Sequence, residues 1–301
     1  MINTSYKANK NPYISFQRKM RNNGELSDLS VKYIKKNPPP TNILNIGLHG
    51  SSADVLDLKK RPFSDIDFFC IANEYDKNSI NYLRKFIDYF NKKAGTWVDM
   101  MMGETNNKGF SLIDFDIDNL ANDHMVFYGE NFEDNIEKLR KNASNEDSII
   151  VLYEKTKGAG LKLKKGLLLL NSKQHVVSFP PIAMKNIKGK KLKTRAITLS
   201  KSILTSCSFA NSAMGYLNGR PVEYSKRKSP EMLEELFGID SKLAKKARDI
   251  YYCTAQKIDL KKFIEEDAFE WLKTQEQIET TLETKIKTSG KALLKNIEHK
   301  L

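Results

Sequence analysis

The chain lacks most of the features that mark secreted, disulfide-stabilised or membrane-spanning proteins. It has three cysteines in 301 residues, and Cys70, Cys207 and Cys253 lie far apart, which favours reduced, buried thiols over a disulfide framework or a zinc site. No apolar run approaches the roughly 20 residues of a membrane span, and the first residues have no secretory apolar core. These absences predict a soluble cytoplasmic protein.

Histidine is also scarce, and the four histidines show no metal-ligand spacing. His49 ends an apolar segment and stands directly before Gly50, so it could lie beside a turn that binds phosphate. Packing at the end of a strand is the more ordinary role for a histidine in this position.

Positive charge is abundant, because 50 Lys and Arg against 37 Asp and Glu give a net charge of +13. A positive field attracts polyanions such as RNA, DNA or a nucleoside triphosphate, although runs of charge are often only solvated surface. Two local groups are more informative than the total. They are Lys155, Lys157, Lys162, Lys164 and Lys165, and then Lys185, Lys188, Lys190, Lys191, Lys193 and Arg195.

A short apolar segment ends in a pattern typical of a phosphate-binding turn. Residues 42–49 have the apolar density of a buried strand, and Gly50 permits the sharp turn that must follow. Residues 51–58 can form a brief helix, whose first N–H groups would face a ligand beside Gly50 and Ser51. Phosphate oxygens are the natural occupants of such a site.

Acidic residues follow in a second pattern, which begins Ser64-Asp65-Ile66-Asp67 and continues into apolar residues. In a strand, Asp65 and Asp67 project from the same face. A helix over residues 77–93 precedes another apolar segment that carries Asp99. If the two strands are neighbours, three carboxylates meet and can hold two Mg²⁺ ions about 3.5–4 Å apart, with Mn²⁺ as a possible substitute.

These residues together resemble the DNA polymerase β-type nucleotidyltransferase superfamily, and in particular its aminoglycoside-nucleotidyltransferase-like and minimal-nucleotidyltransferase branches. The resemblance covers roughly residues 40–130 and includes the apolar-Tyr-Gly segment 125–129. The chain departs from the family pattern after Ala53, where Asp54 and Val55 stand in place of a basic residue and glycine.

The resemblance implies a role for each residue of the pattern. Gly50 and Ser51 would hold the triphosphate of ATP or another NTP, with Ser64 as a further nucleotide-binding residue. Asp65, Asp67 and Asp99 would be both catalytic and metal-binding. The reaction would be Mg²⁺-dependent transfer of a nucleoside monophosphate to a hydroxyl group, with release of pyrophosphate. Lys193 and Arg195, from the second basic group, are candidates to bind phosphates of the nucleotide or of an RNA end.

The expected fold is of the α/β (α+β) class: a nucleotidyltransferase fold with a small mixed sheet and flanking helices, followed by an all-helical domain. We expect an accessory helical segment in residues 1–37, the catalytic domain in 38–145 and the helical domain in 146–301. Residues 131–145 are polar and are expected to join the two domains. Ser229 is expected to cap a helix that begins with Pro230 and ends near Gly238.

The identity of the acceptor remains open at the level of sequence. RNA, such as a tRNA 3′ end, is favoured by the two basic groups. An aminoglycoside-type small molecule is the alternative, with an acidic surface that could include Glu223, Glu231, Glu234 and Glu235. A protein acceptor is a third option, and a non-catalytic nucleotide- or RNA-binding module is the alternative from another class.

Overall fold

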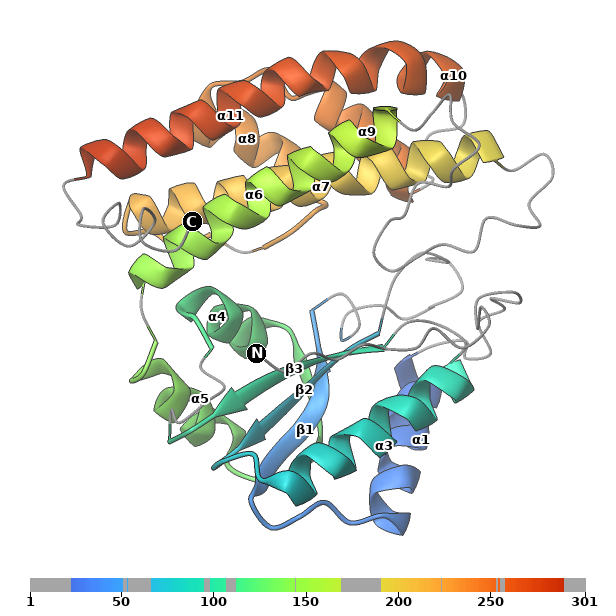
Figure 1. The fold of residues 1–301 in the computed structure, drawn as a ribbon, viewed down its shortest axis with the longest axis vertical. Coiled ribbons are helices and arrows are strands. Elements are labelled where there is room, and N and C mark those ends of the chain that lie inside the picture. Colours follow the sequence, from blue (N-terminus) through green and yellow to red (C-terminus); the bar gives the residue numbers. More distant parts are fainter. Residues whose placement is uncertain are drawn as a thin grey trace.

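The computed structural model describes residues 23–50, 53, 66–94, 98–106, 112–143, 145–168, 191–222, 224–252, 254 and 258–289. Within these ranges a four-stranded sheet with flanking helices is followed by a helical region (Figure 1). The elements of the first part are α1 (Asn23–Lys36), β1 (Ile43–His49), β2 (Ile66–Ala72), α3 (Lys77–Ala94), β3 (Val98–Glu104), α4 (Asp114–Asn122), β4 (His124–Tyr128) and α5 (Phe132–Arg140). Those of the second are α6 (Asn145–Leu168), α7 (Lys191–Leu217), α8 (Ser229–Phe237), α9 (Lys242–Tyr252), α10 (Leu260–Lys262), the π-helix η2 (Phe263–Asp267) and α11 (Ala268–Thr288).

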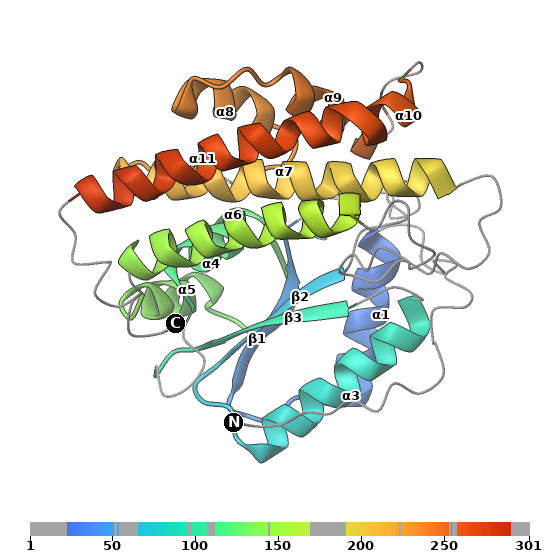
Figure 2. The same cartoon turned by 45° about the horizontal axis from the view of Figure 1, so that its top comes forward.

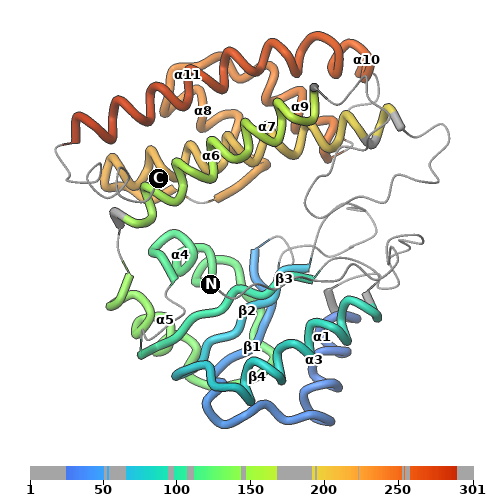
Figure 3. Tube along the Cα trace, in the orientation of Figure 1, coloured from blue at the N-terminus to red at the C-terminus, as the bar shows by residue number. Residues whose placement is uncertain are grey.

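The sheet is mixed, and its strands lie in the order β3-β2-β1-β4 (Figure 3). β1 runs antiparallel to both β2 and β4, whereas β2 and β3 are parallel. A parallel pair requires a crossover connection, and α3 supplies it. The sequence prediction of a small mixed sheet followed by helices is therefore confirmed at the level of fold class.

Helices cover both faces of this sheet because its strands are apolar on both sides. Phe68 and Cys70 of β2 pack in a cluster with side chains of α1 and α3, such as Leu26 and Phe86. Phe69, on the opposite face, packs with side chains of α4 and α5. Figure 2 shows the resulting order of layers: α1 and α3, then the sheet, then α4 and α5, then the long helices.

Polar side chains fix both ends of the crossover helix α3. Asp76 accepts hydrogen bonds from the backbone N–H and the hydroxyl of Ser79, each at 2.7 Å, and these bonds lower the pKa of its carboxyl. At the other end, the Asn91 side chain accepts a hydrogen bond from the N–H of Val98 at 3.0 Å. The start of β3 is thus tied to the helix that delivers it to β2.

The helical region has its own core, centred on α6, α7 and α11 with Trp271 fully buried. Buried Gln275 of α11 connects these three helices. It accepts a hydrogen bond from the Ser206 hydroxyl at 2.7 Å and donates one to the Thr156 carbonyl at 3.3 Å. Buried polar groups are costly unless they are paired, so these bonds specify how the three helices meet.

Helix α4 joins the sheet-bearing part to the helical region. The N–H of Phe115 donates a hydrogen bond to the Ser148 hydroxyl of α6 at 3.1 Å, and the Tyr216 hydroxyl of α7 donates one to the Asp118 carboxylate. Asp116 lies 3.8 Å from the ammonium group of Lys155 in α6. These contacts set the position of α6 and α7 relative to the sheet.

Two local expectations differ from the structure. The polar segment expected to join the domains contains α5, because Phe132, Ile136 and Leu139 form an apolar stripe that is buried on the sheet. Ser229 is also not the cap of α8: it is the first helical residue, and its hydroxyl donates to the Lys226 carbonyl at 3.2 Å. Gly238, by contrast, ends α8 in the left-handed conformation, as predicted.

The cysteine prediction is confirmed for the two cysteines that the structure describes. Cys70 and Cys207 are buried and free, and burial raises the pKa of the Cys70 thiol to about 12. Cys253 lies outside the described residues. Among the helices that could be searched, none combines the length and apolar character needed to cross a membrane.

Candidate functional site

The structure places Asp67 and Asp99 next to each other on neighbouring strands. Asp67 is the second residue of β2 and Asp99 the second residue of β3, and the two are register partners in the parallel pair. Their backbones are therefore about 4.8 Å apart, the usual spacing between strands. Asp67 is partly buried and Asp99 is exposed. The adjacency of two of the three predicted acids thus follows directly from the strand pairing.

Gly50 forms the turn that was expected at the end of β1. It adopts φ 57°, in the left-handed region that favours glycine. Its N–H donates a hydrogen bond to the Asp123 carbonyl at 2.9 Å, and its carbonyl accepts one from the N–H of Ala53 at 3.0 Å. No atom of the described residues would lie within 4 Å of a Cβ added at Gly50. With respect to the described part of the chain, the space beside this turn is therefore open.

Two histidines extend the pair of acids into a row across the whole sheet. Leu48 pairs with Phe68 in the antiparallel register of β1 and β2, so one further residue brings His49 beside Asp67. His49 is in turn the register partner of His124 in β4. The order across the sheet is therefore Asp99, Asp67, His49 and His124.

The row projects from the face of the sheet that α4 and α5 cover. Asp67 stands two residues before Phe69, whose ring packs on that face, and side chains two residues apart in a strand share a face. The His124 ring stacks on Phe132 of α5, with 4.2 Å between ring centroids and 30° between planes. Its Nδ1 is buried and has no hydrogen-bond partner among the described residues. The row thus faces the helical region.

Sequence reasoning missed this row because it depends on strand register. His49 was assigned to packing, and His124 was noted only for the absence of metal-ligand spacing. Only the positions of the two histidines gave a signal. His49 directly precedes Gly50, and His124 directly follows Asp123, whose carbonyl accepts the hydrogen bond from the N–H of Gly50. Pairing of the strands was needed to bring both histidines level with the acids.

The other predicted site residues fall into two groups. Ser51, Ser64 and Asp65 lie outside the described residues, so their predicted roles stay predictions. Lys193 is exposed and Arg195 partly buried in the first turns of α7. Figures 1 and 2 both show this end of α7 on the same side of the molecule as the first residues of β2 and β3.

The donor set of the row suits a hard cation in part. Carboxylate oxygens are the preferred protein ligands of Mg²⁺, which completes its shell with water and substrate phosphates. Within the described ranges no three Asp, Glu, His or Cys side chains are grouped closely enough to hold a metal ion. Asp67 and Asp99 supply two carboxylates, and Asp65 is the residue that would complete the set.

One carboxylate oxygen of Asp99 already has a partner: Oδ1 accepts a hydrogen bond from the N–H of Met100 at 2.8 Å. This bond orients the carboxylate at the start of β3. A side chain held at a strand end in this way keeps a defined position for a ligand, because the strand itself is fixed by pairing with β2.

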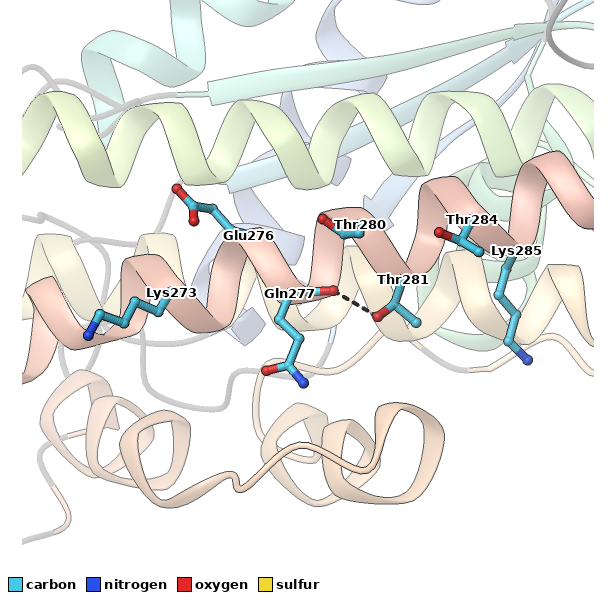
Figure 4. Close-up of a pocket in the computed structure, with 7 residues that line it drawn as sticks. All are labelled: Lys273, Glu276, Gln277, Thr280, Thr281, Thr284 and Lys285. Atoms are coloured by element: carbon cyan, nitrogen blue, oxygen red, sulfur yellow. Dashed lines mark hydrogen bonds between the residues drawn. The ribbon is translucent and has the colours of Figure 1, made fainter.

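A surface depression on α11 is separate from this row. Figure 4 shows that the side chains lining it all come from α11. They are Lys273, Glu276, Gln277, Thr280, Thr281, Thr284 and Lys285. Neither Asp67 nor Asp99 takes part, and the lining brings no group of acids or nucleophiles together. The depression therefore adds nothing to the candidate site.

Compared with known protein families and with curated proteins, the chain gives no match. The features that bear on function are therefore the geometry of the row and the chemistry of its residues.

Proposed function

We propose that this protein is a Mg²⁺-dependent nucleotidyltransferase of the DNA polymerase β type, which transfers a nucleoside monophosphate from an NTP to a hydroxyl group. The single observation that carries the proposal is the register pairing of Asp67 with Asp99, beside the turn at Gly50. It supports the predicted meeting of a carboxylate cluster with a phosphate-binding turn. A soluble cytoplasmic enzyme is the corresponding proposal for its location.

Each residue has a defined part in the proposed reaction. Gly50 and Ser51 bind the triphosphate, with Ser64, Lys193 and Arg195 as further nucleotide-binding residues. Asp65, Asp67 and Asp99 would hold the metal. Bound Mg²⁺ would neutralise phosphate charge and lower the pKa of the attacking hydroxyl. The acceptor oxygen forms a bond to the α-phosphorus, the bond to the bridging oxygen breaks, pyrophosphate leaves, and Asp99 accepts the hydroxyl proton.

His49 belongs to the proposed site because it lies between Asp67 and the Gly50 turn. A histidine N–H at this position can donate a hydrogen bond to a phosphate oxygen of the nucleotide. Bonds of this kind to charged groups are stronger than those between neutral groups. We therefore assign His49 the role of orienting the triphosphate.

The structure gives less support to an aminoglycoside-type acceptor than to RNA. Recognition of such a polycation requires unpaired acidic groups. Glu231 instead pairs with Arg248 at 2.6 Å, and Glu234 accepts hydrogen bonds from Ser241 and Lys245 at 2.6 and 3.1 Å. Two of the four glutamates considered for an acidic surface thus connect α8 to α9.

Label transfer from α-³²P-labelled NTPs tests the proposal. Each NTP is supplied with Mg²⁺ and, separately, with total tRNA or aminoglycosides. Asp67→Asn and Asp99→Asn are each expected to lower transfer at least about 10³-fold, because loss of metal-mediated charge stabilisation costs several kcal/mol. Asp88→Asn, which changes an exposed carboxylate of α3, is the matched control.

The outcomes separate the candidate functions. Transfer of label to tRNA that is lost in both Asp67→Asn and Asp99→Asn would support an RNA nucleotidyltransferase. Transfer of label to the aminoglycoside would instead place the protein in the antibiotic-modifying class. Nucleotide binding without transfer to either acceptor or to added protein would contradict the proposal in favour of a non-catalytic module.

A further inference from the structure

The positive charge of this chain comes from one continuous segment. Residues 155–222 contain 14 Lys and Arg and no Asp or Glu, whereas the whole chain has a net charge of +13. With 37 acidic residues in 301, uniform spacing would place about eight of them in these 68 residues. The rest of the chain is therefore close to neutral, and the surplus needs an explanation specific to this segment.

In the fold, this segment supplies most of α6, all of α7 and the connection between them. The two helices pack side by side in the helical core. In Figures 1 and 2 the C-terminal end of α6 and the N-terminal end of α7 lie together, on the side where β2 and β3 begin. Six basic residues of the segment therefore lie at this end of the helical region, on the side where the strands of Asp67 and Asp99 begin: Lys162, Lys164 and Lys165 near the end of α6, and Lys191, Lys193 and Arg195 at the start of α7.

Four lysines of this end are exposed, and none of them forms an ion pair within the described part of the chain. They are Lys162, Lys164 and Lys165 of α6 and Lys193 of α7, which we call the lysine group. Two lysines nearer the start of α6 differ from these. Lys155 contacts Asp116, and Lys157 forms an ion pair with Glu154 at 3.1 Å. The lysine group is therefore available to an outside anion.

The start of α7 adds an independent indication. The N-terminal end of a helix carries a positive partial charge, so acidic residues stabilise it and basic residues oppose it. The first turn of α7 has no acidic residue, and Lys191, Lys193 and Arg195 are the first, third and fifth residues of the helix. Such an arrangement is unfavourable in the protein alone and becomes favourable when an anion binds.

We propose that the lysine group binds the sugar-phosphate backbone of an RNA whose end reaches Asp67 and Asp99. This identification of the acceptor rests on the proposed function. Lys162, Lys164 and Lys165 lie within one turn of α6, about 5 Å along its axis, and Lys193 adds a fourth ammonium group from α7. Four such groups on two helices suit several phosphates of a chain. Lysine ammonium groups act as point charges on phosphates rather than as bidentate readers of bases, so the binding depends little on sequence. An RNA 3′ end also offers two hydroxyl groups to a transferase.

The test compares two variants that remove the same amount of charge. The first is Lys162→Gln/Lys164→Gln/Lys165→Gln/Lys193→Gln, in the full chain. The control is Lys35→Gln/Lys36→Gln/Lys273→Gln/Lys285→Gln, which changes four exposed lysines of α1 and α11. Binding to fluorescent total tRNA, and to a single-stranded DNA of matched length, is measured by anisotropy between 50 and 200 mM salt.

The first variant is expected to lose about 10²–10³-fold in RNA affinity at 0.1 M salt, and its salt slope should fall by about 3, since each phosphate contact contributes about 0.7–0.9. The control should lose less than about tenfold. Equal losses in the two variants, or failure of the wild-type protein to bind tRNA, would each overturn the proposal. The single-stranded DNA, which offers the same backbone phosphates, should show the same difference between the two variants.

The readout is independent of catalysis. Asp67→Asn and Asp99→Asn should lose far less tRNA affinity than the lysine variant, because they meet only the end of the RNA and the lysine group holds its backbone. If no nucleotide is transferred yet the lysine variant alone loses RNA, the RNA surface stands and the proposed reaction fails. If RNA is labelled equally well by the lysine variant, the reaction stands and this proposal fails.

Discussion

Replacing two glycines by alanine should have very different consequences, although both have a positive φ. Gly50 (φ 57°) would gain a Cβ with no described atom within 4 Å. At Gly129 (φ 94°) the added Cβ would lie 1.7 Å from the Leu44 carbonyl oxygen and 2.7 Å from the side-chain nitrogen of Asn45. The two positions therefore separate backbone strain from steric overlap.

The magnitudes follow from this geometry. Gly50→Ala incurs only the cost of a left-handed conformation, about 1–2 kcal/mol, which corresponds to roughly 2–8 °C in melting temperature for a protein of this size. Gly129→Ala adds overpacking of about 1–3 kcal/mol to a similar strain, for a total of about 2–5 kcal/mol. Thermal unfolding followed by circular dichroism measures both.

The functional part of this prediction concerns the space beside Gly50. If a phosphate of the nucleotide approaches the backbone there, Gly50→Ala should raise KM for the NTP while the protein stays folded. An unfolding temperature for Gly50→Ala as low as that of Gly129→Ala would show that the space is already filled. The reasoning that assigns this turn to a ligand would then be refuted.

Two further predictions concern the junction and the row. Burial raises the pKa of the Asp116 carboxyl, and Lys155 offsets this in part. The protonated carboxyl therefore stabilises the folded protein below the ordinary pKa of an aspartate. This stabilisation is lost as the pH rises through the raised pKa of the folded state. Asp116→Asn should accordingly raise the melting temperature, relative to wild type, more at pH 7 than at pH 3.5, and equal differences at both would contradict this. His49→Ala should lower kcat/KM about tenfold, the equivalent of one hydrogen bond to a charged group, while the protein stays folded. Unchanged kinetics would return His49 to a packing role.

The strands and long helices could be predicted because local pattern and burial agree in them. The apolar segment before Gly50 becomes β1, and the helix expected over residues 77–93 becomes α3 (Lys77–Ala94). The meeting of Asp67 and Asp99 was expected only on the condition that their strands are neighbours, and the parallel pairing of β2 and β3 meets that condition. These features depend on residues close together in sequence.

Features that depend on long-range packing could not be predicted in the same way. The sequence of α5 is polar overall because only one side of the helix is apolar. That side could be recognised as a packing surface only once the sheet face that buries it was known. The position of His124 level with Asp67 required the register of three strands. The sequence also could not show that Lys155 contacts Asp116 whereas Lys162 is exposed, because this difference arises where α4 packs against α6.

Metal binding tests most directly whether the acids on β2 and β3 form one site with Asp65. Mn²⁺ can stand in for Mg²⁺, and its binding in the presence of a non-hydrolysable NTP analogue can be followed by electron paramagnetic resonance. We expect Asp65→Asn, Asp67→Asn and Asp99→Asn each to lose tight Mn²⁺ binding, whereas Asp88→Asn should keep it. Retention of wild-type Mn²⁺ binding by Asp67→Asn or Asp99→Asn would show that these acids do not form the metal site.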